Sequence, residues 1–316
     1  MGCTGIVDDT DTDEVVTQSV RVLSWNVQGL GSPGTLQYES ARDILARLDA
    51  DVVSLNEIDE FEIGYVESLA LELGYSEVFV PGYNPFGSIR NGVMSRWPIR
   101  SRNAFTAAEL SGDEEANDMT RLPIEVIIDP PLVRSDLVVV AQHWKAGSIT
   151  EDAFRRAVDG ARIAQIGERW DPVSDWILVM GDVNAQIDEV PGSPSNFSTI
   201  PGGLPSSYRL GEDLLDQLRT DGLANDPFAP TLAQGFTLLD ALQADGREAT
   251  RPSSDKRLDY IFMSQAVRDA EYAGEVYDAK DEHLGGLEKS GNAPSRSASE
   301  DASDHLPVLI EFTLTN

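Results

Sequence analysis

DWILVMGDVN, at residues 175–184, is the stretch of sequence that does most to decide the fold. An apolar run of this length, rich in large aliphatic side chains, is typical of a strand that is buried on both faces. The run ends in Gly-Asp-Val-Asn, so the strand brings Asp182 and Asn184 to one edge of its sheet. Polar side chains that end a buried strand predict a site at that edge.

Four further polar clusters end or border apolar runs elsewhere in the chain. They are SWN at 24–26, LNE at 55–57, HWK at 143–145 and SDH at 303–305. Three of the runs, RVLSWN, DVVSLNE and DLVVVAQHW, are rich in β-branched residues and predict buried strands. If these strands end at one rim, the clusters bring Asn, Glu, His and Asp together, which is how a fold builds a site for a metal ion and a phosphate.

Helical and strand patterns alternate in a way that indicates the fold class. Apolar residues share one helix face within 41–48 and again within 151–170. Short strands are predicted at SEVFV, NGVMS, NAFTA, LPIEVII, RLDYIFMS and LPVLIEFTL, separated by Gly and Pro turns. We therefore predict an α/β fold, a four-layer α/β/β/α sandwich of two packed mixed sheets with outer helices.

Domain boundaries follow from composition. Residues 1–18 are predicted to be a disordered acidic leader, and 19–316 a single catalytic domain. The stretches 187–230 and 280–302 are too polar and too rich in Gly, Pro and Ser to be predicted as core. We interpret them as loops that shape the substrate site, with plain disorder as the alternative.

The charge of the chain is strongly acidic. The formal net charge is -30, and Lys145, Lys256, Lys280 and Lys289 are its only lysines. An acidic surface repels polyanions on average, which argues against tight, sequence-independent nucleic-acid binding. It does not exclude a nuclease, because a bound metal ion can supply local positive charge.

The amino terminus suggests export. No apolar run approaches the roughly 18 residues of a membrane-spanning helix, so we expect a soluble chain. The single cysteine, Cys3, excludes an internal disulfide, and MGCTGIVDDTDTDE has the layout of a bacterial lipoprotein after removal of its signal. We predict an exported protein, extracellular or periplasmic, with a lipid anchor on Cys3; the alternative is an artificial, frayed terminus.

Several of the clustered residues have the chemistry of a phosphoester site. A hard divalent cation prefers one or two carboxylates, and Glu57 with Asp304 meets that requirement. His143 and His305 can each donate a hydrogen bond to a phosphate oxygen or move a proton. For any one of these residues the alternative is structural: Asp182 could cap a turn, and each histidine could be a satisfied core residue.

Two further kinds of residue complete the predicted site. Asp259 lies in an apolar strand and needs a partner, which His305 would supply. Asn26 and Asn184 can orient a metal-bound water or the phosphate without adding negative charge.

Taken in order, these motifs resemble those of the endonuclease/exonuclease/phosphatase superfamily, from about residue 20 to 314. The matching positions are Asn26 in SWN, Glu57 in LNE, His143 in HWK, Asp182 and Asn184 in GDVN, Asp259 in RLDY, and Asp304 and His305 in SDH. Arg121 in TRLP resembles a phosphate-contacting arginine of the deoxyribonuclease branch. The chain departs from the family at Asn56, where Gln is usual, and at Val183, where Phe is usual. We expect Val183 to point away from the site, since alternate strand residues face opposite sides.

The resemblance implies a divalent-metal-dependent phosphoesterase that cleaves phosphodiester bonds by in-line attack of water. It implies Mg²⁺ or Mn²⁺, with Ca²⁺ as a further candidate, on Glu57 and Asp304 with Asn26 nearby. It assigns the water to Asp182, and charge stabilisation to His143, Asn184 and the Asp259-supported His305. Whether Asp182 or His305 is the base stays open.

The substrate is expected to be a small diester or a nucleic acid, acted on by a monomer without a protein partner. Alternatives are a secreted DNA or RNA endonuclease, a lipid head-group phosphodiesterase and a non-catalytic binding module. A nuclease would need a basic strip near the site, for which the candidates are Arg90, Arg96, Lys145, Arg155, Arg156 and Lys256. A lipid enzyme would need an exposed aromatic hairpin, for which YNPFG at 83–87 is the nearest candidate.

Overall fold

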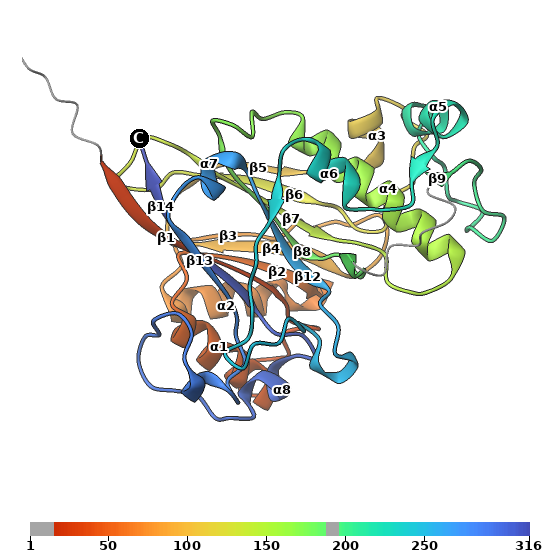
Figure 1. Cartoon of the computed structure of the whole chain (residues 1–316). Helices are drawn as coiled ribbons and strands as arrows, with labels where there is room; N and C mark the ends of the chain where they lie inside the picture. Colours follow the sequence, from red (N-terminus) through yellow and green to blue (C-terminus); the bar gives the residue numbers. More distant parts are fainter. Residues whose placement is uncertain (1–15, 188–195) are drawn as a thin grey trace, which may run out of the picture.

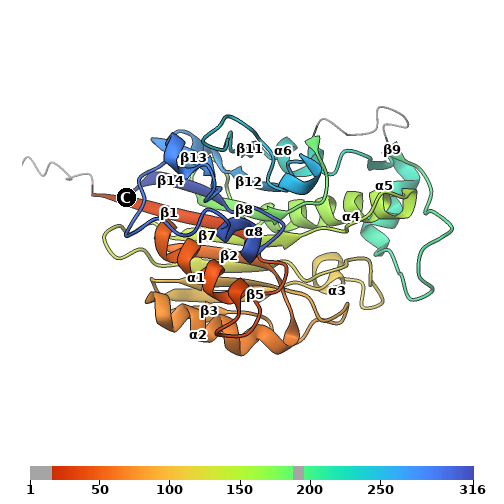
Figure 2. The ribbon, with the colours of Figure 1, turned by 90° about the horizontal axis from the view of Figure 1, so that it is seen from below.

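Two six-stranded mixed sheets pack face to face and carry the fold (Figure 1). The computed structural model describes residues 16–187 and 196–316, so Cys3 and nearly all of the predicted leader lie outside the described residues. Helices cover the outer face of each sheet (Figure 2). The predicted α/β/β/α sandwich is confirmed.

The strands are ordered so that both sheets contain parallel and antiparallel neighbours. The first sheet runs β13 (Tyr272–Val276), β14 (Val308–Thr315), β1 (Thr17–Asn26), β2 (Val52–Ile58), β4 (Arg90–Ser95) and β3 (Glu77–Phe79). The second runs β11 (Thr237–Leu238), β12 (Asp259–Met263), β8 (Trp176–Asp182), β7 (Leu137–His143), β6 (Ile124–Ile128) and β5 (Ile99–Ala104). A separate two-stranded ribbon pairs β9 (Asn196–Phe197) with β10 (Leu223–Ala224).

The helices form the two outer layers. The first sheet is covered by α1 (Leu36–Leu48), α2 (Ile63–Leu73) and α8 (Ala298–Ala302), and the second by α4 (Thr150–Gly167) and α6 (Ala229–Ala233). The remaining short helices are α3 (Ala107–Ser111), α5 (Glu212–Thr220) and α7 (Gln265–Arg268). Helix α1 begins after Thr35, whose hydroxyl accepts a hydrogen bond from the Tyr38 amide, and ends at Asp49 in the left-handed region. No helix in the two described ranges is long and apolar enough to cross a membrane.

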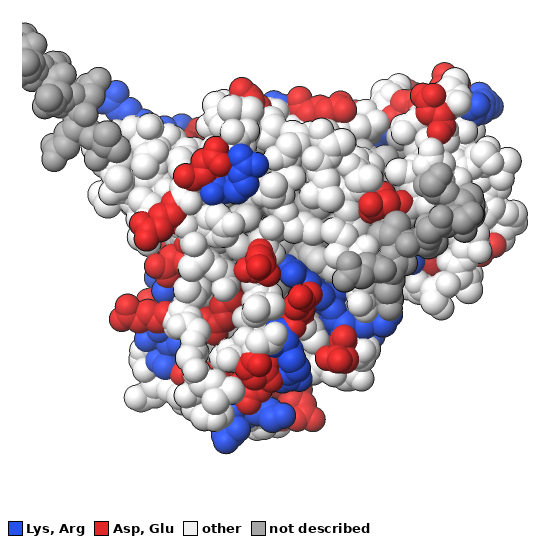
Figure 3. Space-filling view, in the orientation of Figure 1, with Lys and Arg blue, Asp and Glu red and all other residues white. Residues whose placement is uncertain are grey.

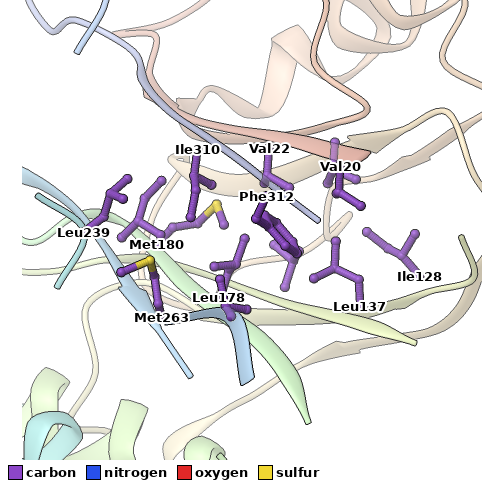
Figure 4. Packing of buried hydrophobic residues seen from close by; sticks show 14 of the residues in the cluster. Val20, Val22, Ile128, Leu137, Leu178, Met180, Leu239, Met263, Ile310 and Phe312 are labelled. Atoms are coloured by element: carbon purple, nitrogen blue, oxygen red, sulfur yellow. The ribbon is translucent and has the colours of Figure 1, made fainter. Parts of the chain in front are cut away.

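The main core lies between the sheets. Val20 and Val22 of β1 and Phe312 of β14 point toward Leu178 and Met180 of β8 (Figure 4). The alternate side chains of β1 point the other way and pack under the helices. Burial of each such side chain contributes roughly 1.5–3 kcal/mol, so the alternating pattern holds the layers in register.

Strand direction brings the ends of neighbouring strands together. Strands β1 and β2 are parallel, with Asn26 opposite Asn56. Strands β7 and β8 are also parallel, with His143 opposite Asp182, and β12 starts beside them with Asp259 opposite Asp182. The polar clusters at these strand ends therefore meet at one end of the sandwich.

Some local predictions are wrong. Helix α2 was not predicted, and β1 begins at Thr17, inside the predicted leader, because Thr17 and Gln18 pair with β14. The stretch 187–230 contains helix α5, whose Leu214 and Leu218 pack on Phe154 of α4 in a small core of their own. Two leucines four residues apart suffice to bury one helix face, even in a polar stretch.

Candidate active site

Asn26 connects the two sheets at the centre of the site. Its Nδ2 atom donates hydrogen bonds to Glu57 Oε1 at 3.1 Å and to Asp182 Oδ2 at 3.0 Å. Asn26 ends β1, Glu57 lies near the end of β2 and Asp182 ends β8. The three side chains were predicted to share one site, and the structure brings them together.

His143 lies beside these carboxylates without a hydrogen bond of its own. Its Nε2 atom is 3.6 Å from Glu57 Oε1 and 3.7 Å from Asp182 Oδ2, and its side chain is fully buried. Neither ring nitrogen has a hydrogen-bond partner among the described residues. Burial, together with the nearby charges of Arg121 and His305, lowers the pKa of His143 well below its usual value. The imidazole is therefore neutral at pH 7. Both of its buried ring nitrogens are left for interaction with a bound substrate or ion.

His305 is in the opposite state. Its Nδ1 atom lies 2.7 Å from Asp259 Oδ2, and its Nε2 atom is 3.9 Å from Asp182 Oδ2. Burial acts to lower the pKa of His305, but the charge of Asp259 and the hydrogen bond to it raise that pKa to about 9. The ring is therefore an imidazolium at pH 7, and the predicted pairing of Asp259 with His305 is present in the structure.

Asp182 is a buried carboxyl group with a raised pKa. Burial and the neighbouring charge of Asp259 raise the pKa of Asp182 to about 7, against the opposing effect of His305 and of hydrogen bonds from Asn184 and Asn26. The Asn184 amide donates to Asp182 Oδ1 at 2.8 Å. Hydrogen bonds from Asn26 and Asn184 thus fix the Asp182 carboxyl group, whose pKa lies close to neutral pH.

Backbone conformation also marks the site. Glu57 and Asn184 have φ angles of 61° and 49°, in the left-handed region that residues other than Gly rarely adopt. Such conformations cost roughly 1–3 kcal/mol each and persist where the surroundings enforce them. Here they turn two side chains at strand ends toward the site.

Asn56 joins the ends of the two sheets behind the site. Its Oδ1 atom accepts a hydrogen bond from the Asp182 amide at 2.9 Å, and its Nδ2 atom donates to the Gln142 carbonyl at 3.0 Å. The strands approach closely at Gly181, where an added Cβ would lie 1.8 Å from the Gln142 oxygen. Val183 is buried in the cluster beneath the outer helices, which confirms that it points away from the site.

Asp304 lies on the rim and is paired with Arg251. Its Oδ2 atom accepts hydrogen bonds from Arg251 Nε at 3.0 Å and Nη2 at 2.8 Å, while Oδ1 is 3.9 Å from His305 Nε2. Sequence reasoning did not identify Arg251, because nothing in RPSSDK marks it as a partner of a residue 53 positions away. Asp304 as a metal ligand stays a prediction.

Arg121 also reaches the rim. Its Nη1 atom donates to the Trp144 carbonyl at 2.8 Å, and Trp144 precedes Lys145 in the HWK cluster. Burial lowers the pKa of Arg121, although the charges of Asp159, Glu57 and Asp182 oppose that change. The guanidinium forms no salt bridge with a described residue, so its charge is available to an anion.

The side chains present fit a divalent cation. Ligand atoms of Glu57, His143 and Asp182 lie within 4.8 Å of one another, as do those of Asp182, Asp259 and His305. In the second group the His305–Asp259 hydrogen bond already engages two members. Glu57, next to the unpartnered nitrogens of His143, is therefore the better anchor for a cation.

Three cavities surround this centre. One of about 720 Å³ is lined by Gln28 and Asp304 and by residues of the stretch 280–302. One of about 280 Å³ is lined by Arg121, Lys145 and Arg155. One of about 430 Å³ is lined by residues of the stretch 187–230 and by Asn184, Arg156, Arg251 and Lys256. Figure 3 shows Lys and Arg side chains, with Asp and Glu side chains between them, in a hollow near the site ends of β8 and β12.

Two of the predicted basic residues do not contribute a free guanidinium to the rim of the site. Arg96 pairs with Asp49 beside the start of β2, at the opposite end of that strand from Glu57. Arg90 is buried and donates to the carbonyl of Pro81 at 2.9 Å. The remaining basic residues around the site form what we call the basic rim: Arg121, Lys145, Arg155, Arg156, Arg251 and Lys256.

Comparisons with known proteins agree with this architecture. The chain is similar to the structure of an endonuclease/exonuclease/phosphatase from Beutenbergia cavernae, with 19% identity, coverage of 94% of this chain and 72% of that chain, and a TM-score of 0.59. It is similar to sphingomyelinase C from Streptomyces griseocarneus, with 17% identity, coverage of 93% and 99%, and a TM-score of 0.55. It is also similar to the 3′ phosphatase NExo from Neisseria, solved with a product DNA hairpin, with 16% identity, coverage of 93% and 99%, and a TM-score of 0.55. At these identities the likeness shows the fold alone.

No curated protein matches the chain. A sequence model described as the Endonuclease/Exonuclease/phosphatase family matches residues 23–305, nearly the whole described domain. The chain belongs to the endonuclease/exonuclease/phosphatase family.

Proposed function

We propose that the protein is a divalent-metal-dependent phosphoesterase that hydrolyses phosphodiester bonds by in-line attack of water. The observation that carries the proposal is the pairing of two histidines in opposite charge states around one carboxylate. Neutral His143 has no hydrogen-bond partner, whereas the charged His305 is held by Asp259 and faces Asp182. A satisfied core would not leave both ring nitrogens of His143 without a partner.

The cation would be held by Glu57, with Asn26 beside it and Asp304 at the rim. Magnesium or manganese in this position supplies positive charge that offsets the phosphate and the departing oxygen. The carboxylate oxygens of Glu57 and Asp304 and the amide oxygen of Asn26 are the kind of ligand that suits either ion.

Asp182 is the better candidate for the base. A general base works best when its pKa is near the working pH, and the pKa of Asp182 is about 7. His305, with a pKa of about 9, holds its proton at neutral pH and cannot accept another. Asp182 therefore takes the proton of the attacking water, while Asn26 and the Asn184 amide fix its orientation.

The two histidines and Asn184 stabilise the negative charge that develops on the non-bridging phosphate oxygens. The Nε2–H group of His305 donates to a non-bridging oxygen, and neutral His143 donates through one of its free nitrogens. The side-chain Nδ2 of Asn184 donates to the Trp144 carbonyl at 3.2 Å, and this hydrogen bond keeps the carboxamide group at the rim of the site. Donors that are already positioned stabilise developing charge without reorganisation.

A lipid head-group substrate receives less support. In the YNPFG turn, the Phe86 ring packs against the small cluster of Ala107, Ala116 and Met119, and Tyr83 is the exposed ring. One exposed ring is a weak membrane contact compared with an apolar hairpin.

The proposal is tested with bis-p-nitrophenyl phosphate. We expect turnover with Mg²⁺ or Mn²⁺, loss of turnover with chelator, and a fall of roughly a hundredfold or more in Glu57→Gln. Arg134→Gln, a change at an exposed position between β6 and β7, is the matched control and should retain activity. Undiminished activity in chelator, or in Glu57→Gln, would refute the proposal.

A further inference from the structure

The cavity of about 430 Å³ next to Asn184 has an unusual charge for this protein. We call it the Arg156 cavity. Its charged lining residues are Arg156, Arg251 and Lys256, and no described carboxylate lines it. The chain as a whole carries 54 acidic and 24 basic residues, so three basic side chains and no carboxylate among the described lining residues are unexpected from composition.

Arg156 is fixed in position but is not neutralised. Its Nη1 atom donates to the carbonyls of Lys145 at 2.9 Å and Gly147 at 2.8 Å. It forms no salt bridge with any residue of the two described ranges, although most arginines of the described domain do. Burial lowers the pKa of Arg156, against the opposing charges of Asp152 and Asp159. A half-buried cation held by neutral carbonyls is stabilised by an anion that enters beside it.

Arg251 contributes a second donor group to the same cavity. Its Nε and Nη2 atoms both donate to Asp304 Oδ2, which fixes the guanidinium plane. Its Nη1 atom donates to no described residue, and the side chain is 41% exposed. Because the guanidinium has five donors in a rigid fork, Arg251 can hold Asp304 and still bind an anion with the remaining nitrogen.

The cavity borders the catalytic centre at Asn184. That residue lines the cavity and its amide donates to Asp182, so a ligand in the cavity lies next to the phosphate under attack. The volume is within the range of ligand pockets, roughly 300–1,000 Å³. An anion in this cavity would therefore lie close to the catalytic centre.

We propose that the Arg156 cavity is a subsite for a second phosphate group of the substrate, bound by Arg156 and Arg251. The inference rests on the proposed function and narrows it: the preferred substrate is a phosphate ester that carries another phosphate a few bonds from the first. A terminal phosphate and the next diester of a nucleotide chain offer the same chemistry, and the test separates them.

The test uses three substrates that release the same p-nitrophenol. They are the p-nitrophenyl ester of thymidine 5′-phosphate, the same compound with a 3′-phosphate, and the same compound with a 3′-phosphodiester to a second thymidine. In the wild-type protein we expect kcat/KM to rise about tenfold or more when a second phosphate is present, as one charge-assisted hydrogen bond allows. A larger gain with the 3′-phosphate indicates a terminal phosphate, and a larger gain with the diester indicates a nucleotide chain.

Variants locate the subsite. In Arg156→Gln the ratio of kcat/KM between two-phosphate and one-phosphate substrates should fall to about one, and Arg156→Lys should retain part of the ratio. Arg155→Gln changes the residue before Arg156 in α4. Arg155 lines the cavity of about 280 Å³, so this variant should keep the wild-type ratio. Arg134→Gln should also keep it. A collapse in Arg155→Gln with an intact ratio in Arg156→Gln would overturn the proposal.

Binding provides a readout that does not need turnover. Calorimetry should show that thymidine 3′,5′-bisphosphate binds the metal-loaded wild-type protein about tenfold more tightly than thymidine 5′-phosphate does. In Arg156→Gln the two nucleotides should bind with the same affinity. Equal affinity of the wild-type protein for both nucleotides contradicts the subsite even if diesters are hydrolysed. Lack of diester hydrolysis with the affinity difference intact contradicts the proposed function alone.

Discussion

Two buried polar clusters of the described domain differ in how many of their hydrogen-bonding groups have a partner. In the first, Arg162 Nη2 donates to Asp118 Oδ2 at 2.6 Å and Arg162 Nη1 donates to Asp213 Oδ2 at 2.7 Å. The Gly211 amide also donates to Asp118, so the buried charges are paired. In the second, the catalytic centre, Asp182 and Asp259 crowd together and His143 has two unpartnered nitrogens. Both clusters lie in the same fold, and only the first is complete without a ligand.

The difference separates structural from functional polar groups. Buried polar groups are normally satisfied, and an exception needs an explanation. The Arg162 cluster joins α4 to α5 and has the properties of a structural ion pair. The catalytic centre keeps its polar groups available for substrate and cation. Mutations should therefore affect stability in the first cluster and turnover in the second.

The largest expected effect is on turnover. His305→Ala removes the imidazolium that donates to the phosphate and should lower kcat/KM for bis-p-nitrophenyl phosphate by roughly 10²–10³-fold. Asp259→Asn should cause a smaller loss, because the ring remains but loses its orienting charge. Steady-state kinetics of the two variants, with their unfolding free energies measured in urea, checks the ranking. Full activity in His305→Ala would remove the distinction between the clusters.

The next effect is on stability. Arg162→Met leaves Asp118 buried without its partner, so the free energy of unfolding should fall by about 3–5 kcal/mol. The variant should retain wild-type kcat/KM per folded molecule, because Arg162 faces α5 and not the centre. Urea titration and an active-fraction assay measure both quantities. A stable Arg162→Met protein with impaired turnover would contradict the assignment.

These two clusters also show what sequence can and cannot predict. The strand ends were predictable, because apolar runs that stop at Asn, Glu, His or Asp identify both the strand and its edge. The Asp259–His305 pair followed from the need of a buried carboxylate for a partner. The Asp304–Arg251 pair did not, since it depends on how the turn at Pro252–Ser254 is oriented.

Helix α5 was missed for a related reason. Its two buried leucines are the weak signal of a small core within a polar stretch, and the Arg162–Asp213 pair that anchors it joins residues 51 positions apart. Contacts between residues so far apart depend on tertiary packing, which cannot be predicted from local composition.

Another buried carboxyl group, Asp159, gives a pH-dependent test of stability. It accepts a hydrogen bond from the Lys145 amide at 2.9 Å, and burial raises its pKa to about 7. Between pH 4 and 7 the folded protein keeps this proton while the unfolded chain loses it, so the contribution of Asp159 to stability falls as pH rises. Over that interval the loss should be about 3 kcal/mol.

Asp159→Asn should remove this dependence, because the amide keeps an acceptor for Lys145 and does not titrate. The difference in unfolding free energy between variant and wild type should therefore grow in favour of the variant from pH 5 to pH 8. Urea titrations at several pH values measure it. A constant difference would show that Asp159 is ionised in the folded protein throughout.

The smallest expected effect is stabilisation by metal. A cation that binds the folded protein alone raises the unfolding free energy by about 2.7 kcal/mol at a hundredfold excess over its Kd. Wild type and Arg162→Met should both gain this stability with Mn²⁺, and Glu57→Gln should not. Equal gains in all three proteins would place the cation outside the catalytic centre.

We expect a cation at Glu57 to complete the unsatisfied polar groups of the catalytic centre. Anomalous diffraction from a crystal soaked in Mn²⁺ tests it most directly. We predict a peak about 2.2 Å from a Glu57 carboxylate oxygen, within the distances of oxygen ligands to such ions. A peak at another site with none near Glu57 would contradict the account.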